Sequence, residues 1–101
     1  MTHIVVSPRA DADFDDILER LTLQAGHLVA DRYAAQLESI YERPLMFPEI
    51  GSRPPRLGRR ARIMVLDPYV LVYDYARRED TVHVVRILDG RRNITRRLVR
   101  Q

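Results

Sequence analysis

Cysteine, lysine and tryptophan are all absent from this chain of 101 residues. Without cysteine there is no disulfide and no thiolate for catalysis or metal binding. Without lysine, all 17 basic residues are arginine, which excludes a Schiff-base lysine or a lysine general base. No apolar run reaches the roughly 18 residues of a membrane span, and Met1–Val6 lacks the regions of a secretory signal. We therefore expect a cytoplasmic protein with no membrane segment.

The composition is that of an ordinary globular protein, with 46% apolar and 31% charged residues. The length predicts a single domain over residues 1–101. The net charge of +3 hides an asymmetry, because residues 1–50 carry nine acids and four arginines, whereas residues 51–101 carry thirteen arginines and five acids. A charge of −5 thus precedes a charge of +8. Either the second half meets an anionic partner, or the two halves attract each other within the fold.

The first third of the sequence predicts a strand followed by a helical hairpin. His3–Val6 is a short β-branched run, and Ser7-Pro8 is typical of a helix start, with an N-cap and a proline at the first helical position. Apolar residues then recur at helical spacing up to the expected stop at Gly26: Ala10, Phe14, Ile17, Leu18 and Leu21. A connection of roughly three residues leads to a second helix, predicted over about 28–42. Pro44 should end or kink that helix.

The remaining sequence predicts an antiparallel sheet. A loop rich in Pro, Gly and Arg runs from Pro44 to Arg60 and is long enough to suggest a function. Strands are expected over 61–66, 69–76 and 82–88, and the short turns between them indicate an antiparallel meander. In the last strand Val82, Val84, Arg86 and Leu88 are expected on one face and His83, Val85 and Ile87 on the other. Both faces are largely apolar, so one should meet the hairpin and the other a partner.

The C-terminal segment after Gly90 holds five arginines and no acid: Arg91, Arg92, Arg96, Arg97 and Arg100. Ile94, Leu98 and Val99 lie among them at helical spacing, which favours a short docked helix over a bare cationic arm. The complete prediction is an α+β fold, with an N-terminal strand, a helical hairpin, a three-stranded antiparallel meander and a short C-terminal helix or arm.

No constellation of catalytic or metal-binding residues is visible. His3, His27 and His83 fall on different elements without ligand spacing, so no metal and no cofactor are expected. Asp13, Asp15 and Asp16 are interpreted as a solvated helix face. Arg62 and Arg86 lie within predicted strands, where each would pair with Asp74 or extend past the sheet edge, or else bind an anion or a partner's acids.

Four segments in this order resemble the ParE/RelE superfamily of toxins from type II toxin–antitoxin systems. The opening Ser7–Ile17 has a small residue, an alanine and acids leading into the first helix. Pro48–Gly51 matches a Pro-x-x-Gly loop, Tyr69–Tyr73 the central strand, and Val84–Arg92 a closing strand with Gly-Arg-Arg. The resemblance covers nearly the whole chain and implies a compact toxin encoded beside an antitoxin, whose C-terminal segment would wrap it.

The superfamily implies two activities. RelE-like members cut mRNA on the ribosome, whereas ParE-like members inhibit DNA gyrase and have no catalytic site of their own. The catalytic groups of RelE-like members fall here on residues unsuited to that chemistry. Their central-strand arginine corresponds to Val70, their paired lysines lie near Ala61 and Ile63, and their tail tyrosine lies near Leu98. Only Arg92, in the Gly-Arg-Arg element, matches.

These residues favour a ParE-like toxin that binds gyrase, arrests growth, stabilises a plasmid or genome, and is neutralised by a cognate antitoxin. No catalytic residue is expected, and the contact surface for target or antitoxin is assigned to Arg91, Arg92, Arg96, Arg97 and Arg100. Two alternatives stay open. One is a metal-independent, ribosome-dependent endoribonuclease that uses Arg62, Arg86 and Arg92. The other is a non-toxic module that only binds an antitoxin or nucleic acid. The assembly, a homodimer or a toxin–antitoxin hetero-oligomer, also stays open.

Overall fold

A computed structural model describes all residues, 1–101, and has the predicted α+β architecture. Its elements follow in the order β1 (His3–Val6), α1 (Pro8–Ala25), α2 (His27–Ser39), α3 (Glu42–Met46), the 3-10 turn η1 (Pro55–Leu57), β2 (Ala61–Leu66), β3 (Tyr69–Ala76), β4 (Thr81–Asp89) and α4 (Arg96–Val99). The predicted strands are confirmed to within one residue at each end. No helix is both long and apolar enough to cross a membrane.

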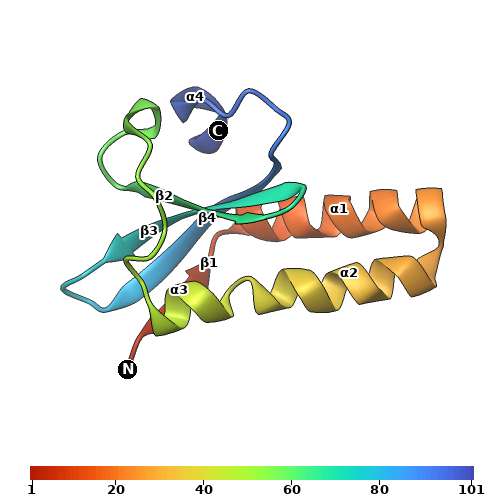
Figure 1. The fold of residues 1–101 in the computed structure, drawn as a ribbon, viewed down its shortest axis with the longest axis horizontal. Coiled ribbons are helices and arrows are strands. Elements are labelled where there is room, and N and C mark those ends of the chain that lie inside the picture. The colour runs from red at the N-terminus through yellow and green to blue at the C-terminus, as the bar shows by residue number, and fades with distance from the viewer.

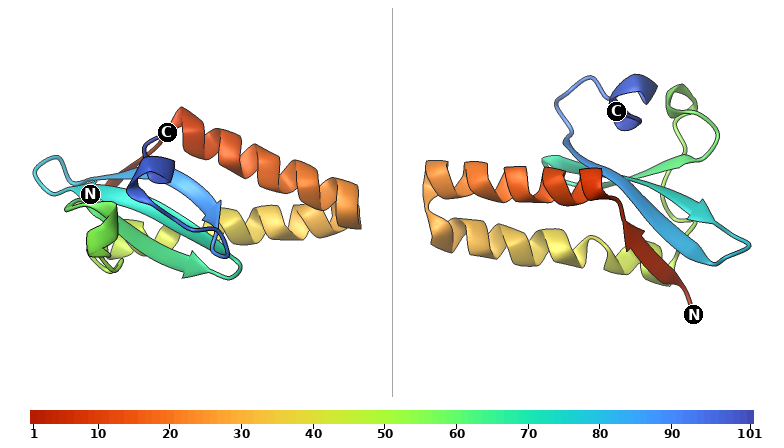
Figure 2. Two further views of the ribbon diagram at one scale, coloured as in Figure 1. Left: turned by 90° about the horizontal axis from the view of Figure 1, so that it is seen from above. Right: turned by 180° about the vertical axis from the view of Figure 1, so that it is seen from behind.

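One four-stranded sheet with the order β1-β4-β3-β2 forms the centre of the molecule. The strands β2, β3 and β4 make the predicted antiparallel meander, and β1 adds to it in parallel with β4, with Ile4 opposite Val82. In Figure 1 the α1–α2 hairpin covers one face of the sheet and projects far beyond it, while α4 lies on the other side. The view from behind in Figure 2 shows α4 and the hairpin on the same opposite sides of the sheet.

Helix α1 begins and ends where the sequence predicts. Ser7 is the N-cap, and its hydroxyl accepts a hydrogen bond of 3.0 Å from the Ala10 N–H. Gly26 ends the helix with a φ of 86°, which is accessible to glycine at little cost, and α2 starts at the next residue. The expected connection of three residues is therefore reduced to one. Helix α2 ends earlier than predicted, at Ser39, and Pro44 lies inside the separate short helix α3.

Two hydrophobic clusters hold the layers together. The larger cluster packs the hairpin against the sheet through fully buried residues such as Leu37, Leu71 and Tyr73. The smaller cluster lies on the opposite face and joins β3 to the C-terminal segment through Val72, Ile94 and Val99. The sequence predicted that a partner would cover this second face of the sheet, but the chain's own C-terminal segment and η1 cover part of it. The short C-terminal helix is confirmed.

A β-bulge in β4 changes which residues share a face. Val72 lies opposite Arg86 and Tyr73 opposite Val84, so Val85 is an extra residue in β4. Val84 and Ile87 therefore both belong to the cluster under the hairpin. The predicted strict alternation along 82–88 is wrong beyond Val84, because a bulge shifts the alternation of side chains by one residue.

Candidate functional site

A buried ion pair links the start of the hairpin to the end of the sheet. The Arg86 side chain is only 2% exposed and donates to both carboxylate oxygens of Asp13, over 2.7 and 3.0 Å. Asp13 also accepts the Ile87 N–H over 3.0 Å, where β4 has run past the end of β1. The Arg86 guanidinium also donates to the Leu98 carbonyl over 2.6 Å. Asp13 was wrongly assigned to a solvated face, since it follows Ala10 by three residues and lies on the buried side of α1.

The Pro-x-x-Gly loop is held against the sheet by Tyr73. The Tyr73 hydroxyl accepts the Gly51 N–H over 2.9 Å and donates to the Pro48 carbonyl over 3.0 Å. A Cβ at position 51 would lie 2.6 Å from that hydroxyl oxygen, so only glycine fits there. Burial raises the pKa of the Tyr73 hydroxyl, which keeps the group neutral. This anchor places the loop, and with it Glu49, beside the open part of the sheet.

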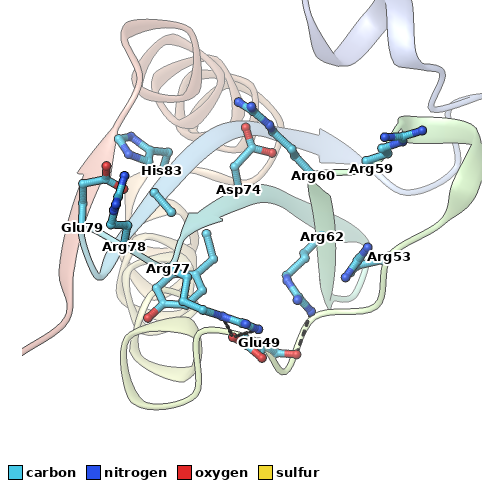
Figure 3. Close-up of a pocket in the computed structure, with 12 residues that line it drawn as sticks. Glu49, Arg53, Arg59, Arg60, Arg62, Asp74, Arg77, Arg78, Glu79 and His83 are labelled. Atoms are coloured by element: carbon cyan, nitrogen blue, oxygen red, sulfur yellow. Dashed lines mark hydrogen bonds and ion pairs between the residues drawn. The ribbon is translucent and has the colours of Figure 1, made fainter.

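The largest hollow of the molecule is a cleft of about 630 Å³, formed where the start of β2 and the β3–β4 turn lie beside the loop that precedes β2. Six arginines converge on this arginine cleft from the loop, from β2 and from the β3–β4 turn (Figure 3): Arg53, Arg59, Arg60, Arg62, Arg77 and Arg78. Glu49, Asp74 and Glu79 are its acids, and His83 lines its floor in β4. The strand register brings these segments together, since Asp74 lies opposite both Ala61 and His83.

The cleft's acids are mostly engaged, whereas most of its arginines are not. Glu49 accepts from Arg77 at 2.6 Å, and Asp74 pairs with Arg100 at 3.2 Å. Arg62 donates to the Glu49 and Gly51 carbonyls over 2.8 and 3.0 Å. Arg86 is bound to Asp13. The suggested pairing of Arg62 or Arg86 with Asp74 is therefore wrong. The remaining cleft arginines form no ion pair and no side-chain hydrogen bond with the protein: Arg53, Arg59, Arg60 and Arg78.

An apolar hollow of about 490 Å³ adjoins the cleft and shares Glu49 and Tyr75 with it. Met46, Phe47 and Ile50 line it and are 72%, 59% and 52% exposed. The Tyr75 hydroxyl at this border donates to Asp80 over 2.7 Å. That hydrogen bond raises the pKa of Tyr75 and lowers the pKa of Asp80, so the tyrosine stays neutral and the aspartate charged.

The five C-terminal arginines do not form one surface. Arg91 is exposed and bound to Asp89 at 2.6 Å, which lowers the pKa of that carboxyl from 3.8 to about 2. Arg92 lines a separate hollow of about 240 Å³ beside α1. Arg96 and Arg100 lie with Arg59 and Arg60 around another hollow at the edge of the arginine cleft. Arg97 is exposed and forms no ion pair within 4 Å.

The residues of the endoribonuclease alternative do not converge. Arg62 lines the arginine cleft, whereas Arg86 and Arg92 line the hollow beside α1. The donors of Arg86 are already directed at Asp13 and at the Leu98 carbonyl. No group of three or more His, Asp or Glu side chains is placed to hold a metal ion.

Sequence reasoning missed most of the arginine cleft. Its arginines come from a loop whose length suggested a function but no particular residue, and from a turn interpreted only as a connection. Their meeting depends on the strand register. The sequence signal that could have found them is the local density of arginine in Gly58-Arg59-Arg60 and in Arg77-Arg78. By contrast, the C-terminal arginines attracted notice because they are close together in sequence, and the fold separates them.

Comparisons with known proteins agree with this architecture. A solved structure titled "Chromosomal ParDE TA system from P. aeruginosa" superposes with a TM-score of 0.76 at 16% identity, covering 88% of this chain and 96% of that chain. At that identity the likeness concerns the fold alone. No curated protein sequence matches significantly. The family model described as "ParE toxin of type II toxin-antitoxin system, parDE" matches residues 4–94, and the chain therefore belongs to the ParE toxin family.

Proposed function

We propose that this protein is the toxin of a type II toxin–antitoxin pair, that it inhibits DNA gyrase by binding it, and that a cognate antitoxin neutralises it. Family membership supports the toxin role, and the choice of binding over catalysis rests on one observation. Three of the four places where RelE-like toxins put catalytic groups are occupied here by apolar residues, and only Arg92 matches. Val70 is 7% exposed and Ala61 is 0% exposed, and both pack in the smaller hydrophobic cluster. Leu98 packs against the same cluster.

Metal-free cleavage of RNA needs a group that activates the 2′-hydroxyl and another that protonates the leaving oxygen. Aliphatic side chains at these positions supply neither. No rotamer of an aliphatic side chain presents a polar group. The inhibitor role needs only a surface that recognises its target, and this is the role that the chain's side chains support best.

The proposed contacts are the C-terminal arginines, which the fold divides into separate groups: Arg91, Arg92, Arg96, Arg97 and Arg100. All five are exposed, and guanidinium groups bind carboxylates and phosphates in a bidentate manner. Arg91 and Arg92 stand apart from the others, at the end of β4. Because the Arg91–Asp89 pair is exposed to solvent, replacing Arg91 changes the surface and leaves the fold intact.

The direct test is the supercoiling of relaxed plasmid by purified gyrase in the presence of the purified chain. We expect inhibition that rises with toxin concentration and is relieved by the antitoxin encoded beside it. Arg91→Ala with Arg92→Ala should lose at least tenfold in inhibitory potency. The matched control, Arg32→Ala with Arg43→Ala, removes two other exposed arginines and should inhibit like the wild type. Cleavage of translated mRNA without any effect on gyrase would contradict the proposal.

A further inference from the structure

The arginine cleft is a second charged surface, and none of its six arginines is among the proposed gyrase contacts, although Arg96 and Arg100 border it. We propose that it binds the phosphodiester backbone of single-stranded nucleic acid. This inference is independent of the proposed function, because it concerns a direct complex of this chain with an oligonucleotide.

The first support is charge that the protein does not satisfy itself. Arg53, Arg59, Arg60 and Arg78 are exposed and have no acidic partner within 4 Å. Of the three acids that line the cleft, Glu49 is paired with Arg77 and Asp74 with Arg100, so only Glu79, which forms no ion pair, is left against these four arginines. Like charges crowded in a concave surface repel each other, and an anion that enters the cleft relieves that repulsion.

The second support is the shape and lining of the cleft. Tyr75 and Ala76 are the only hydrophobic residues among those that line it. A peptide partner buries apolar anchors at the centre of its interface, and this cleft offers almost none. A phosphate backbone requires only cationic and hydrogen-bonding groups, which is what the cleft presents. Nucleic acid therefore fits the cleft better than an acidic peptide does.

The third support concerns the form of the nucleic acid. The cleft is hollowed, and in Figure 3 its arginines line the rim around a floor made by β3 and β4. A duplex is a convex rod that is usually read by a protruding helix or ribbon, whereas one strand lies inside a groove. The adjoining apolar hollow holds Phe47, which is 59% exposed, and Tyr75. An exposed aromatic ring beside a cationic groove is a platform on which an unpaired base stacks.

The test measures fluorescence anisotropy of labelled 20-nucleotide probes, oligo-dT and oligo-U, with the full-length chain between 50 and 200 mM salt. Four unpaired arginines on four phosphates give a slope of log affinity against log salt of about −3 for a single strand. The affinity should therefore fall about 50-fold over that fourfold range of salt. DNA and RNA probes of equal affinity would mean that only the backbone is recognised, and a preference for oligo-U would mean that the 2′-hydroxyl is recognised as well.

Matched variants locate the site. Arg59→Gln with Arg60→Gln removes two of the four contacts and should reduce the slope to about −1.4. Arg9→Gln with Arg32→Gln removes the same charge from exposed helical positions outside the cleft and should leave the slope unchanged. Arg53→Gln with Arg78→Gln, at opposite sides of the cleft in Figure 3, provides a second pair if the first variant folds poorly. Phe47→Ala should weaken binding about fivefold or more without changing the slope.

Several results would overturn the proposal. Equal losses in the cleft and control variants would mean that only net charge matters. Tighter binding of a 20-base-pair duplex than of either single strand would exclude the groove geometry. Capture of a labelled poly-glutamate peptide, with no binding of the oligonucleotides, would assign the cleft to an acidic protein segment. None of these outcomes depends on whether gyrase is inhibited.

Discussion

Removal of the Asp13 carboxylate should destabilise the fold more than any other single loss of charge. In the Asp13→Ala variant the Arg86 guanidinium, 2% exposed, would lose both hydrogen bonds to its counter-charge. Breaking a buried pair from one side costs about 3–5 kcal/mol, because the remaining charge is buried without compensation. The Ile87 N–H would also lose its acceptor. Against a total stability of about 5–15 kcal/mol, this loss removes at least about one fifth of the free energy of unfolding.

Urea unfolding followed by circular dichroism measures this loss. With a slope of about 1.5 kcal/mol per molar urea, the midpoint should fall by about 2–3 M. The informative control is the double variant Asp13→Leu with Arg86→Met, which removes both charges and keeps apolar volume. It should be more stable than Asp13→Ala alone, since a buried pair is replaceable by packed apolar side chains.

The reasoning would be refuted by either of two results. One is a loss below about 1 kcal/mol for Asp13→Ala, which would place the pair among those of exposed surfaces. The other is simple additivity of the losses in Asp13→Leu and Arg86→Met, because residues in one hydrogen-bond network should show a coupling of about 0.5–3 kcal/mol.

Three further outcomes are expected. Tyr73→Phe leaves the buried Gly51 N–H without an acceptor and should cost about 1–3 kcal/mol in urea unfolding, whereas Gly51→Ala forces a Cβ to 2.6 Å from the Tyr73 hydroxyl and should cost more. Val99→Ala should cost about 2 kcal/mol, because Val99 is 1% exposed; an unchanged midpoint would mean that the C-terminal helix is not docked. The Arg91 guanidinium depresses the pKa of Asp89 from 3.8 to about 2. The stability that the Arg91–Asp89 pair contributes is therefore present above pH 4 and is lost as the pH falls towards 2. Asp89→Asn should therefore lose less stability between pH 4 and pH 2 than the wild type, and an identical acid profile would exclude this pair as a cause.

The local signals in the sequence were sufficient for most elements of the fold. The Ser7-Pro8 cap, the stop at Gly26 and the alternating strands depend on short-range physics, and the structure confirms them. The end of the second helix was placed too late because Pro44 sits in the first turn of a new helix, where proline is tolerated.

Features that depend on tertiary packing were not predictable in the same way. The bulge at Val85 has no sequence marker such as glycine, and it decides which face Ile87 joins. The burial of Asp13 had a signal, since an acid at the helical spacing of Ala10 and Ile17 lies on the apolar side and requires a partner. That partner, Arg86, is 73 residues away in sequence.

The resemblance motifs gain physical reasons from the structure. The acid of the opening segment and the arginine of the closing strand are the two halves of the buried ion pair. The glycine of the Pro-x-x-Gly loop and the last tyrosine of the central-strand motif form the Gly51–Tyr73 anchor. The motifs therefore describe how the fold is held together. They do not by themselves choose between the activities of the superfamily, which is why the side chains at Val70 and Ala61 carry that choice.

The measurement that tests the central claim most directly is pulse-labelling of DNA and protein synthesis after induction of this chain in a bacterium that lacks the antitoxin. A gyrase inhibitor stops DNA synthesis first while translation continues, and Arg91→Ala with Arg92→Ala removes that effect. If translation stops first instead, the target is the ribosome, and the account of a binding toxin without catalytic chemistry is contradicted.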